Sequence, residues 1–154
     1  MHVMFICLGN ICRSPMAERV ARKLAAERGL DVRLTSAGTS AEEAGAPIDR
    51  RAQRLLRERG YDVEGHVARR IDQQLIEDVD LFVVAEDYHG DRLARLGVDR
   101  AKIRLVTDYD PESEKGAPLP DPWYGDLDGF EATLGVLERA IPNLLDDVAR
   151  GTRA

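Results

Sequence analysis

The chain has 154 residues, of which 44% are hydrophobic, and its 22 basic and 28 acidic side chains give a formal net charge of −6. This length is typical of one domain, since domains commonly contain about 100–150 residues. The negative balance excludes a general electrostatic attraction to nucleic acid. No apolar run approaches the roughly 20 residues that cross a bilayer. Neither nucleic acid nor a membrane is therefore an expected partner.

The cysteines, the histidines and the first residues indicate the compartment and limit the chemistry. Cys7 and Cys12 are the only two cysteines, too few for a secreted disulfide framework. The apolar start, residues 1–6, is too short for a signal peptide and lacks a basic region. We therefore expect a cytoplasmic protein with reduced thiols. No metal site and no cofactor are expected, because the three histidines show no ligand spacing; they are His2, His66 and His89.

Apolar runs and helical periodicities alternate along the chain. Strands are predicted at about 3–6, 32–36, 79–85 and 103–106, and helices at about 14–28, 49–59, 75–76, 91–96 and 130–149. Strands that alternate with helices form right-handed crossovers and a parallel sheet covered on both faces. We expect one α/β domain over residues 1–154, a three-layer sandwich with a four-stranded parallel sheet.

The segment 7–14 lies between the first strand and the first helix, where α/β sheets bind ligands. Ser14 is the expected cap of that helix, with Pro15 at its first position. Helix N-termini and successive backbone amides favour anions, and Gly9 and Asn10 suit the left-handed backbone of a tight loop. The segment is therefore a candidate phosphate cradle.

Cys7 and Arg13 bracket this loop. The guanidinium of Arg13 is a planar fork suited to two phosphate oxygens. An anion-binding loop also favours the thiolate of Cys7, which would make it an activated nucleophile. The spacing alone is equally compatible with Cys7 as a small buried hydrophobic residue at the end of a strand.

Several blocks of sequence resemble one family in the order in which that family carries them. Residues 7–18, Cys-Leu-Gly-Asn-Ile-Cys-Arg-Ser-Pro-Met-Ala-Glu, closely resemble the phosphate-binding loop of low-molecular-weight protein tyrosine phosphatases. The resemblance continues at Ser36-Ala37-Gly38-Thr39, at His66-Val67-Ala68-Arg69 and at Asp121-Pro122-Trp123-Tyr124-Gly125. Together the blocks span essentially the whole chain, for which a flavodoxin-like strand order 2-1-3-4 is expected.

The resemblance implies a reaction through a phosphocysteine. Cys7 matches the nucleophile, Arg13 matches the residue that clamps the phosphate oxygens, and Asp121 matches the general acid that later activates water. A step of this kind needs such an acid and base, although Asp121 alone would read as an exposed turn residue. The residues implied to bind phosphate are Leu8, Gly9, Asn10, Ile11, Cys12, Arg13 and Ser14.

The resemblance also assigns supporting roles. Asn10, Ser36 and His66 match a hydrogen-bond network that holds the loop, and Ser14 matches the hydroxyl that stabilises the thiolate. Cys12 matches the second cysteine, which protects the nucleophile through a disulfide under oxidation.

The substrate implied is a tyrosine-phosphorylated protein. Ile11 is the main indication, because related arginine phosphatases resemble this chain but have a threonine there; Trp123 and Tyr124 would form a facing aromatic wall. This chain departs from the family pattern at two places, which leaves its preference among phosphopeptides open. Residues 41–44 lack the rim aromatic of many members, and either Glu86 or Asp87 takes an acidic position near the site.

Other functions fit these residues less well. A thiol-dependent arsenate reductase needs further cysteines, and none follows Cys12. A phosphotyrosine-binding module needs neither nucleophile nor acid, and a redox-sensing dithiol would not explain Arg13 or Asp121. A phosphoarginine phosphatase of the same fold stays an alternative. These features do not set the oligomeric state.

Overall fold

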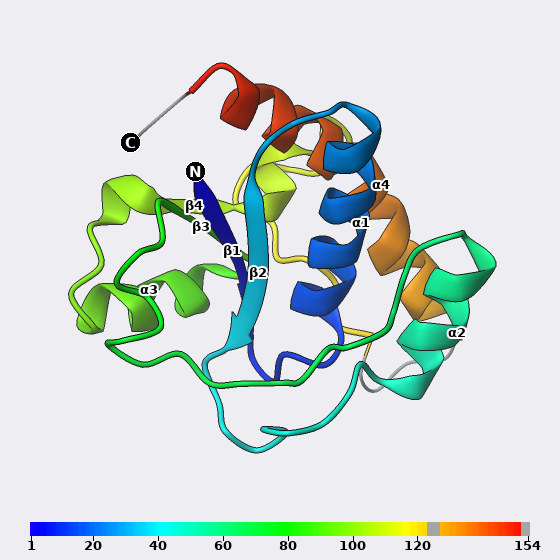
Figure 1. Cartoon of the computed structure of the whole chain (residues 1–154), viewed down its shortest axis with the longest axis horizontal. Coiled ribbons are helices and arrows are strands. Elements are labelled where there is room, and N and C mark those ends of the chain that lie inside the picture. The colour runs from blue at the N-terminus through cyan, green and yellow to red at the C-terminus, as the bar shows by residue number, and fades with distance from the viewer. Residues whose placement is uncertain (123–126, 152–154) are drawn as a thin grey trace.

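Four short parallel strands form a sheet through the middle of the molecule (Figure 1). They are β1 (His2–Cys7), β2 (Arg33–Gly38), β3 (Leu81–Val84) and β4 (Ile103–Leu105). Their order is β2-β1-β3-β4, which confirms the predicted sheet. The structure is a computed structural model that describes residues 1–122 and 127–151.

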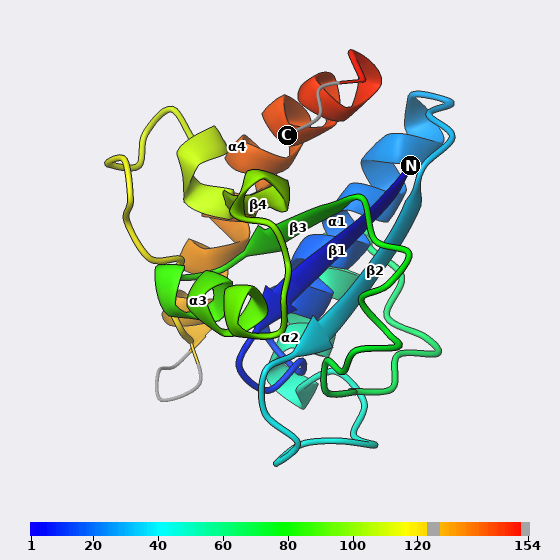
Figure 2. The same ribbon diagram turned by 90° about the vertical axis from the view of Figure 1, so that its left-hand side faces the viewer.

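Helices cover both faces of this sheet, as predicted. The helices α1 (Arg13–Glu27), α2 (Arg50–Glu58) and α4 (Leu127–Ala149) lie on one side, and α3 (Asp87–Arg95) lies on the other (Figures 1 and 2). Two single turns of 3₁₀ helix, Arg100–Lys102 and Val106–Tyr109, flank β4.

The central strand β1 explains why two layers of helices are needed. All of its residues are buried, and successive side chains of a strand point to opposite faces. Val3 and Phe5 join the larger core with α1 and α4, whereas Met4 and Ile6 join a second core with Leu93 of α3. A strand buried on both faces is typical of a parallel sheet.

Two helix predictions need correction. Residues 75–76 form hydrogen-bonded turns and not a helix, because the backbone bonds there are long and do not form a regular ladder: Ile76 N–H donates to the Asp72 carbonyl at 3.2 Å and Glu77 N–H to the Gln74 carbonyl at 3.4 Å. Helix α3 begins at Asp87 and not near residue 91, because Glu86 and His89 form a reciprocal capping box.

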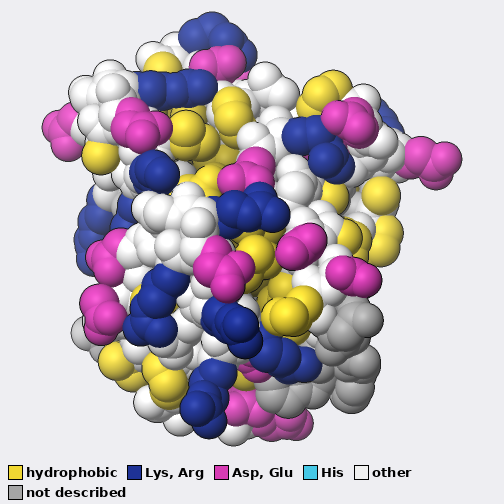
Figure 3. All heavy atoms as spheres, turned by 90° about the vertical axis from the view of Figure 1, so that its right-hand side faces the viewer, with side chains coloured by type: hydrophobic (Ala, Val, Ile, Leu, Met, Phe, Trp, Pro, Cys, Tyr) yellow, Lys and Arg dark blue, Asp and Glu magenta, His cyan; other side chains and the backbone are white. Residues whose placement is uncertain are grey.

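The chain returns repeatedly to one edge of the sheet. The strands β1 and β2 run to the lower edge in Figure 2, where the loop after β1 and the segment after β2 lie together. On the face that carries α2, basic and acidic side chains are interspersed and do not gather into one basic patch (Figure 3). Within residues 1–122 and 127–151, no helix combines the length and apolarity required to span a membrane.

Candidate active site

The loop after β1 leads directly into α1. Cys12 occupies the N-cap position without a side-chain cap, and Arg13 is the first helical residue. The predictions that Ser14 caps the helix and that Pro15 occupies its first position are therefore wrong. Pro15 still lies in the first turn, where a backbone N–H has no intrahelical partner to lose, and the hydroxyl of Ser14 is used elsewhere.

That hydroxyl lies against the thiol of Cys7. The Ser14 Oγ atom is 3.0 Å from Cys7 Sγ, and both residues are buried. Ser14 Oγ also accepts a hydrogen bond of 2.8 Å from the side-chain amide of Asn10. Because the oxygen is thus an acceptor on one side, its own O–H is available to donate to the sulfur. A hydroxyl in this position is a suitable hydrogen-bond donor to a thiolate.

Asn10 is the centre of the loop. It is fully buried with a φ of 59°, the left-handed conformation that Asn tolerates. Its amide also donates to Ser36 Oγ at 3.0 Å, and its Oδ1 accepts the backbone N–H of Arg69 at 3.0 Å. The Nε2–H of His66 donates to the Asn10 carbonyl at 2.7 Å. Every polar group of the side chain is therefore engaged.

His66 is suited to this role as a neutral imidazole. Burial lowers its pKa, although the hydrogen bond to Asn10 opposes that shift. Gly9, in contrast, does not adopt the left-handed backbone that we predicted, since positive φ in this loop is confined to Asn10.

The network extends to a buried carboxylate that sequence reasoning missed. Ser36 Oγ donates to Glu18 Oε1 at 2.5 Å, and Glu18 in turn pairs with Arg22 one helical turn later. The hydrogen bonds therefore run from Glu18 through Ser36, Asn10 and Ser14 to Cys7. Glu18 is the last residue of the block 7–18 that resembles the phosphatase loop. Its place in that block is the feature of the sequence from which its role could have been predicted.

Gly38, at the end of β2, is a second residue of the site whose role the sequence did not predict. A Cβ atom there would lie 2.6 Å from the Leu8 carbonyl oxygen and 3.1 Å from the Asn10 nitrogen. Only glycine allows β2 to approach the loop so closely.

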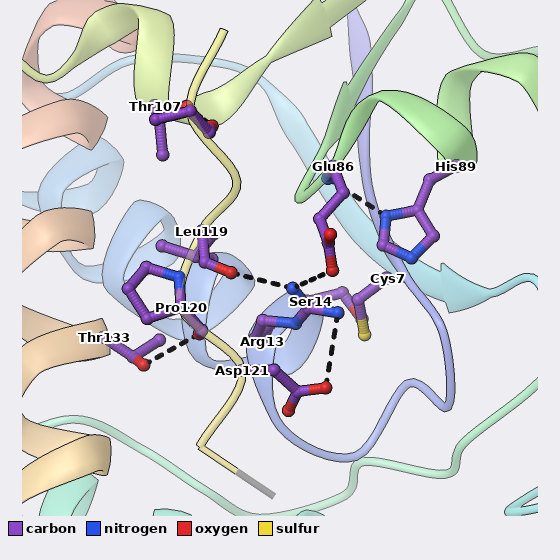
Figure 4. Close-up of polar contacts among 11 residues, drawn as sticks. Cys7, Arg13, Ser14, Glu86, His89, Thr107, Leu119, Pro120, Asp121 and Thr133 are labelled. Carbon is purple, nitrogen blue, oxygen red and sulfur yellow. Dashed lines mark hydrogen bonds and ion pairs between the residues drawn. The ribbon is translucent and has the colours of Figure 1, made fainter. Parts of the chain in front are cut away.

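Arg13 is buried and held from several sides. Its Nη1 donates to Glu86 Oε2 and to the Leu119 carbonyl, each at 2.8 Å, and its Nη2 is 3.7 Å from Asp121 Oδ2 (Figure 4). Burial alone would lower the pKa of Arg13, but the hydrogen bond to Glu86 and nearby negative charge raise it. The guanidinium is a fixed cation.

The structure identifies Glu86 as the acidic residue beside the loop. Its carboxylate contacts Arg13, and its backbone N–H donates to His89 Nδ1 at 3.1 Å. Asp87 lies exposed in the first turn of α3 and makes no such contact within the described part of the chain. His89 is fully buried, and burial together with the charge of Arg13 lowers its pKa to about 3.

Asp121 reaches the loop on a segment that is fastened at two points. The backbone N–H of Leu119 donates to the Ala85 carbonyl at 2.9 Å, and Thr133 Oγ1 donates to the Pro120 carbonyl at 3.0 Å. In Figure 4 the carboxylates of Asp121 and Glu86 point at Arg13 from two sides. Trp123 and Tyr124, the predicted aromatic wall, lie outside the described residues.

A cavity of about 160 Å³ opens over this loop. It brings together the predicted residues Cys7, Arg13 and Asp121, with Ile11 on its wall; its full lining is Cys7, Leu8, Gly9, Ile11, Cys12, Arg13, Ser40, Glu42, Glu43 and Asp121. Cys7 and Cys12 are both free. Burial, reinforced by the charge of Asp49, raises the pKa of Cys12, so this residue is a protonated thiol.

Ser36 and His66 lie behind the loop and not on the cavity wall. They support Asn10 and are not placed to touch a ligand. Within residues 1–122 and 127–151, no group of three or more His, Cys, Asp or Glu side chains is arranged to hold a metal ion.

Comparison with known proteins gives one consistent family. Residues 2–154 match the model of the family described as low molecular weight phosphotyrosine protein phosphatase. A low molecular weight protein-tyrosine phosphatase A from Mycobacterium tuberculosis is 41% identical over 149 residues, which cover 95% of this chain and 90% of that protein.

Solved structures agree with this result. A protein tyrosine phosphatase from Entamoeba histolytica superposes with a TM-score of 0.91 at 30% identity, covering 98% of each chain. The arginine phosphatase YwlE, solved with a phosphorylated active-site serine, superposes with a TM-score of 0.86 at 27% identity, covering 97% of each chain. The fold is therefore shared by phosphatases of two different substrate classes.

Proposed function

Because the chain belongs to the low molecular weight phosphotyrosine protein phosphatase family, we propose that it hydrolyses phosphotyrosine in proteins through a phosphocysteine intermediate. The observation that carries this proposal is the convergence of Cys7, Arg13 and Asp121 on one cavity. A nucleophile, an anion clamp and a proton donor are the groups that the reaction needs.

The first step transfers the phosphoryl group to sulfur. The phosphate lies in the loop before α1, where backbone amides and the positive end of the helix face its oxygens. Arg13 neutralises charge on those oxygens in the transition state. Cys7 Sγ attacks phosphorus as the bond to the aryl oxygen breaks, and Asp121 gives its proton to that oxygen.

The second step restores the enzyme. Asp121, now a carboxylate, accepts a proton from a water molecule that attacks the phosphocysteine. The S–P bond breaks, inorganic phosphate leaves, and Cys7 is again a thiolate held by Ser14. The two steps together consume one water and need no other reactant.

The buried Ile11 side chain supports phosphotyrosine over phosphoarginine. It lines the cavity beside Leu8, and such an apolar surface packs on a phenyl ring but cannot hydrogen-bond a guanidinium. The similarity to the arginine phosphatase YwlE makes phosphoarginine the competing substrate.

Rapid-mixing kinetics with an aryl phosphate tests the function. We expect a burst of aryl alcohol without added metal, no turnover for Cys7→Ser, and slowed turnover with accumulated phosphocysteine for Asp121→Ala. Undiminished activity of Cys7→Ser would refute the mechanism. Comparison of phosphotyrosine with phosphoarginine for the wild type and Ile11→Thr then tests specificity; faster phosphoarginine hydrolysis by the variant supports the role of Ile11.

Cys12 lines the same cavity as Cys7, and both thiols are free. We propose that it forms a reversible disulfide with Cys7 under oxidation, which shields the nucleophile from sulfinic acid. A reducing compartment, the cytoplasm, would keep both thiols free for catalysis.

A further inference from the structure

The mouth of the proposed phosphate site carries negative charge that the reaction does not use. Glu42 and Glu43 line the cavity together with the loop after β1. Within the described residues, neither carboxylate forms an ion pair or a hydrogen bond with another side chain. Among the described residues of the cavity wall, Arg13 is the only cation, and it already contacts Glu86 and Asp121.

Backbone hydrogen bonds hold both glutamates at this mouth. Ser40 N–H donates to the Leu8 carbonyl at 2.9 Å, and Glu42 N–H donates to Ser40 Oγ at 3.1 Å. Glu43 is fixed by the Ala46 N–H, which donates to its carbonyl at 3.0 Å. The segment is thus anchored to the loop that carries the nucleophile.

Glu43 also lies directly over that loop. A Cβ atom at Gly9 would be 3.4 Å from Glu43 Cγ, the distance of ordinary van der Waals contact. Glu43 therefore lies close to the loop, and both glutamates belong to the lining of the cavity. Leu8, 43% exposed, presents an apolar surface to the same cavity.

These charges oppose the binding of an isolated dianion. Two carboxylates beside a phosphate dianion raise its free energy by Coulomb repulsion, which reduces the attraction that Arg13 supplies. A cationic side chain on the substrate, next to the phosphorylated residue, would remove this repulsion and gain an ion pair with each glutamate.

We propose that Glu42 and Glu43 select phosphotyrosine residues flanked by lysine or arginine. The proposal rests on the function proposed above and names the class of phosphoprotein that this site takes. The phosphate enters the loop, the ring packs on Ile11 and Leu8, and a neighbouring basic side chain lies along the glutamates. The selection is electrostatic, so it must weaken as salt increases.

The test uses two phosphotyrosyl peptides that differ only in two flanking residues, lysines in one and glutamates in the other. For the wild type at low salt, we expect kcat/KM to be about three- to tenfold higher for the lysine peptide, since exposed ion pairs contribute up to about a factor of five each. The double variant Glu42→Gln/Glu43→Gln should lose this preference, and 0.5 M salt should reduce it in the wild type.

Glu27→Gln/Glu77→Gln is the matched control, because both glutamates are exposed and lie at the opposite edge of the sheet. It should retain the wild-type preference. Equal kcat/KM for the two peptides, with Cys7-dependent hydrolysis of both, would overturn the selection and leave the proposed function intact. Failure to hydrolyse either peptide would instead contradict the function. An unchanged lysine preference in the double variant Glu42→Gln/Glu43→Gln would also overturn the proposal.

Discussion

Glu86 Oε2 accepts a hydrogen bond from Arg13 Nη1 at 2.8 Å, and Glu86 belongs to the cap of α3 on the opposite side of the sheet from α1. The arginine that would clamp the phosphate is therefore oriented from both helical layers. The Leu119 carbonyl accepts from the same nitrogen at 2.8 Å. This arrangement leaves Nη2, which lies toward Asp121, as the nitrogen nearest the general acid.

Removal of the Glu86 carboxylate should impair catalysis more than folding. We expect Glu86→Ala to lower kcat by about tenfold or more, because a hydrogen bond to a charged group contributes about 1.5–3 kcal/mol. Glu86→Gln retains an acceptor and should keep much of the activity. Steady-state kinetics with an aryl phosphate measures both, and Asp87→Asn is the neighbouring control. Equal activity of Glu86→Ala and Asp87→Asn would contradict an orienting role.

Substitutions of Asn10 separate two contributions to the free energy of unfolding, one from its backbone conformation and one from its side-chain hydrogen bonds. Asn10→Gly accommodates the φ of 59° but loses the amide bonds to Ser14 and Ser36. We expect it to lower the free energy of unfolding by about 1–3 kcal/mol. Asn10→Ala adds the strain of a left-handed residue with a Cβ, about 1 kcal/mol more. Urea denaturation of the two variants measures the difference, and identical midpoints would refute the strain argument.

Gly38 should not tolerate a larger residue. The Cβ atom of Gly38→Ala would lie 2.6 Å from a backbone oxygen that cannot rotate away, so we expect a loss of stability of about 1–3 kcal/mol and reduced activity. Gly135→Ala is the control, because its Cβ would meet only the end of the Arg139 side chain at 3.6 Å. That substitution within α4 should stabilise the protein by about 0.5–1 kcal/mol. Thermal unfolding and phosphatase assays compare the two, and an unaffected Gly38→Ala would contradict the close approach.

The buried His89 should make stability depend on pH. Its pKa is about 3 in the folded protein, below the ordinary value of about 6.5. As the pH falls below about 6.5, the unfolded chain takes up a proton that the folded protein excludes, so stability decreases. We expect a contribution on the order of 2 kcal/mol between pH 7 and pH 5.

His89→Asn isolates this contribution. Asparagine presents an oxygen to the backbone N–H of Glu86 but does not titrate, while His2 and His66 titrate in both proteins. Chemical denaturation at pH 7 and pH 5 should therefore show a shallower loss for the variant. A variant with the same pH dependence as the wild type would show that His89 is not the titrating group.

The sequence alone was enough to predict that the proposed nucleophile and the proposed phosphate clamp lie in one loop. Cys7 and Arg13 are close in the chain, so a strand, a tight loop and a helix start suffice to place them together. Both helical layers also followed, because buried strands and amphipathic helices alternate along the chain. The strand order was implied by the family resemblance, and the structure confirms it. Asp121 was assigned through its resemblance to a family block and not through any local pattern.

Only the tertiary structure decided the relationships between distant segments. The choice of Glu86 over Asp87 depends on where α3 begins relative to Arg13, and the need for glycine at Gly38 depends on how closely β2 approaches the loop. Local pattern predicted the hydroxyl of Ser14 as a helix cap, which is wrong, whereas the family resemblance assigned it to Cys7, which it faces. Local propensity cannot choose between such partners, because a polar group is satisfied by whichever neighbour the packing of the whole chain brings within hydrogen-bond distance.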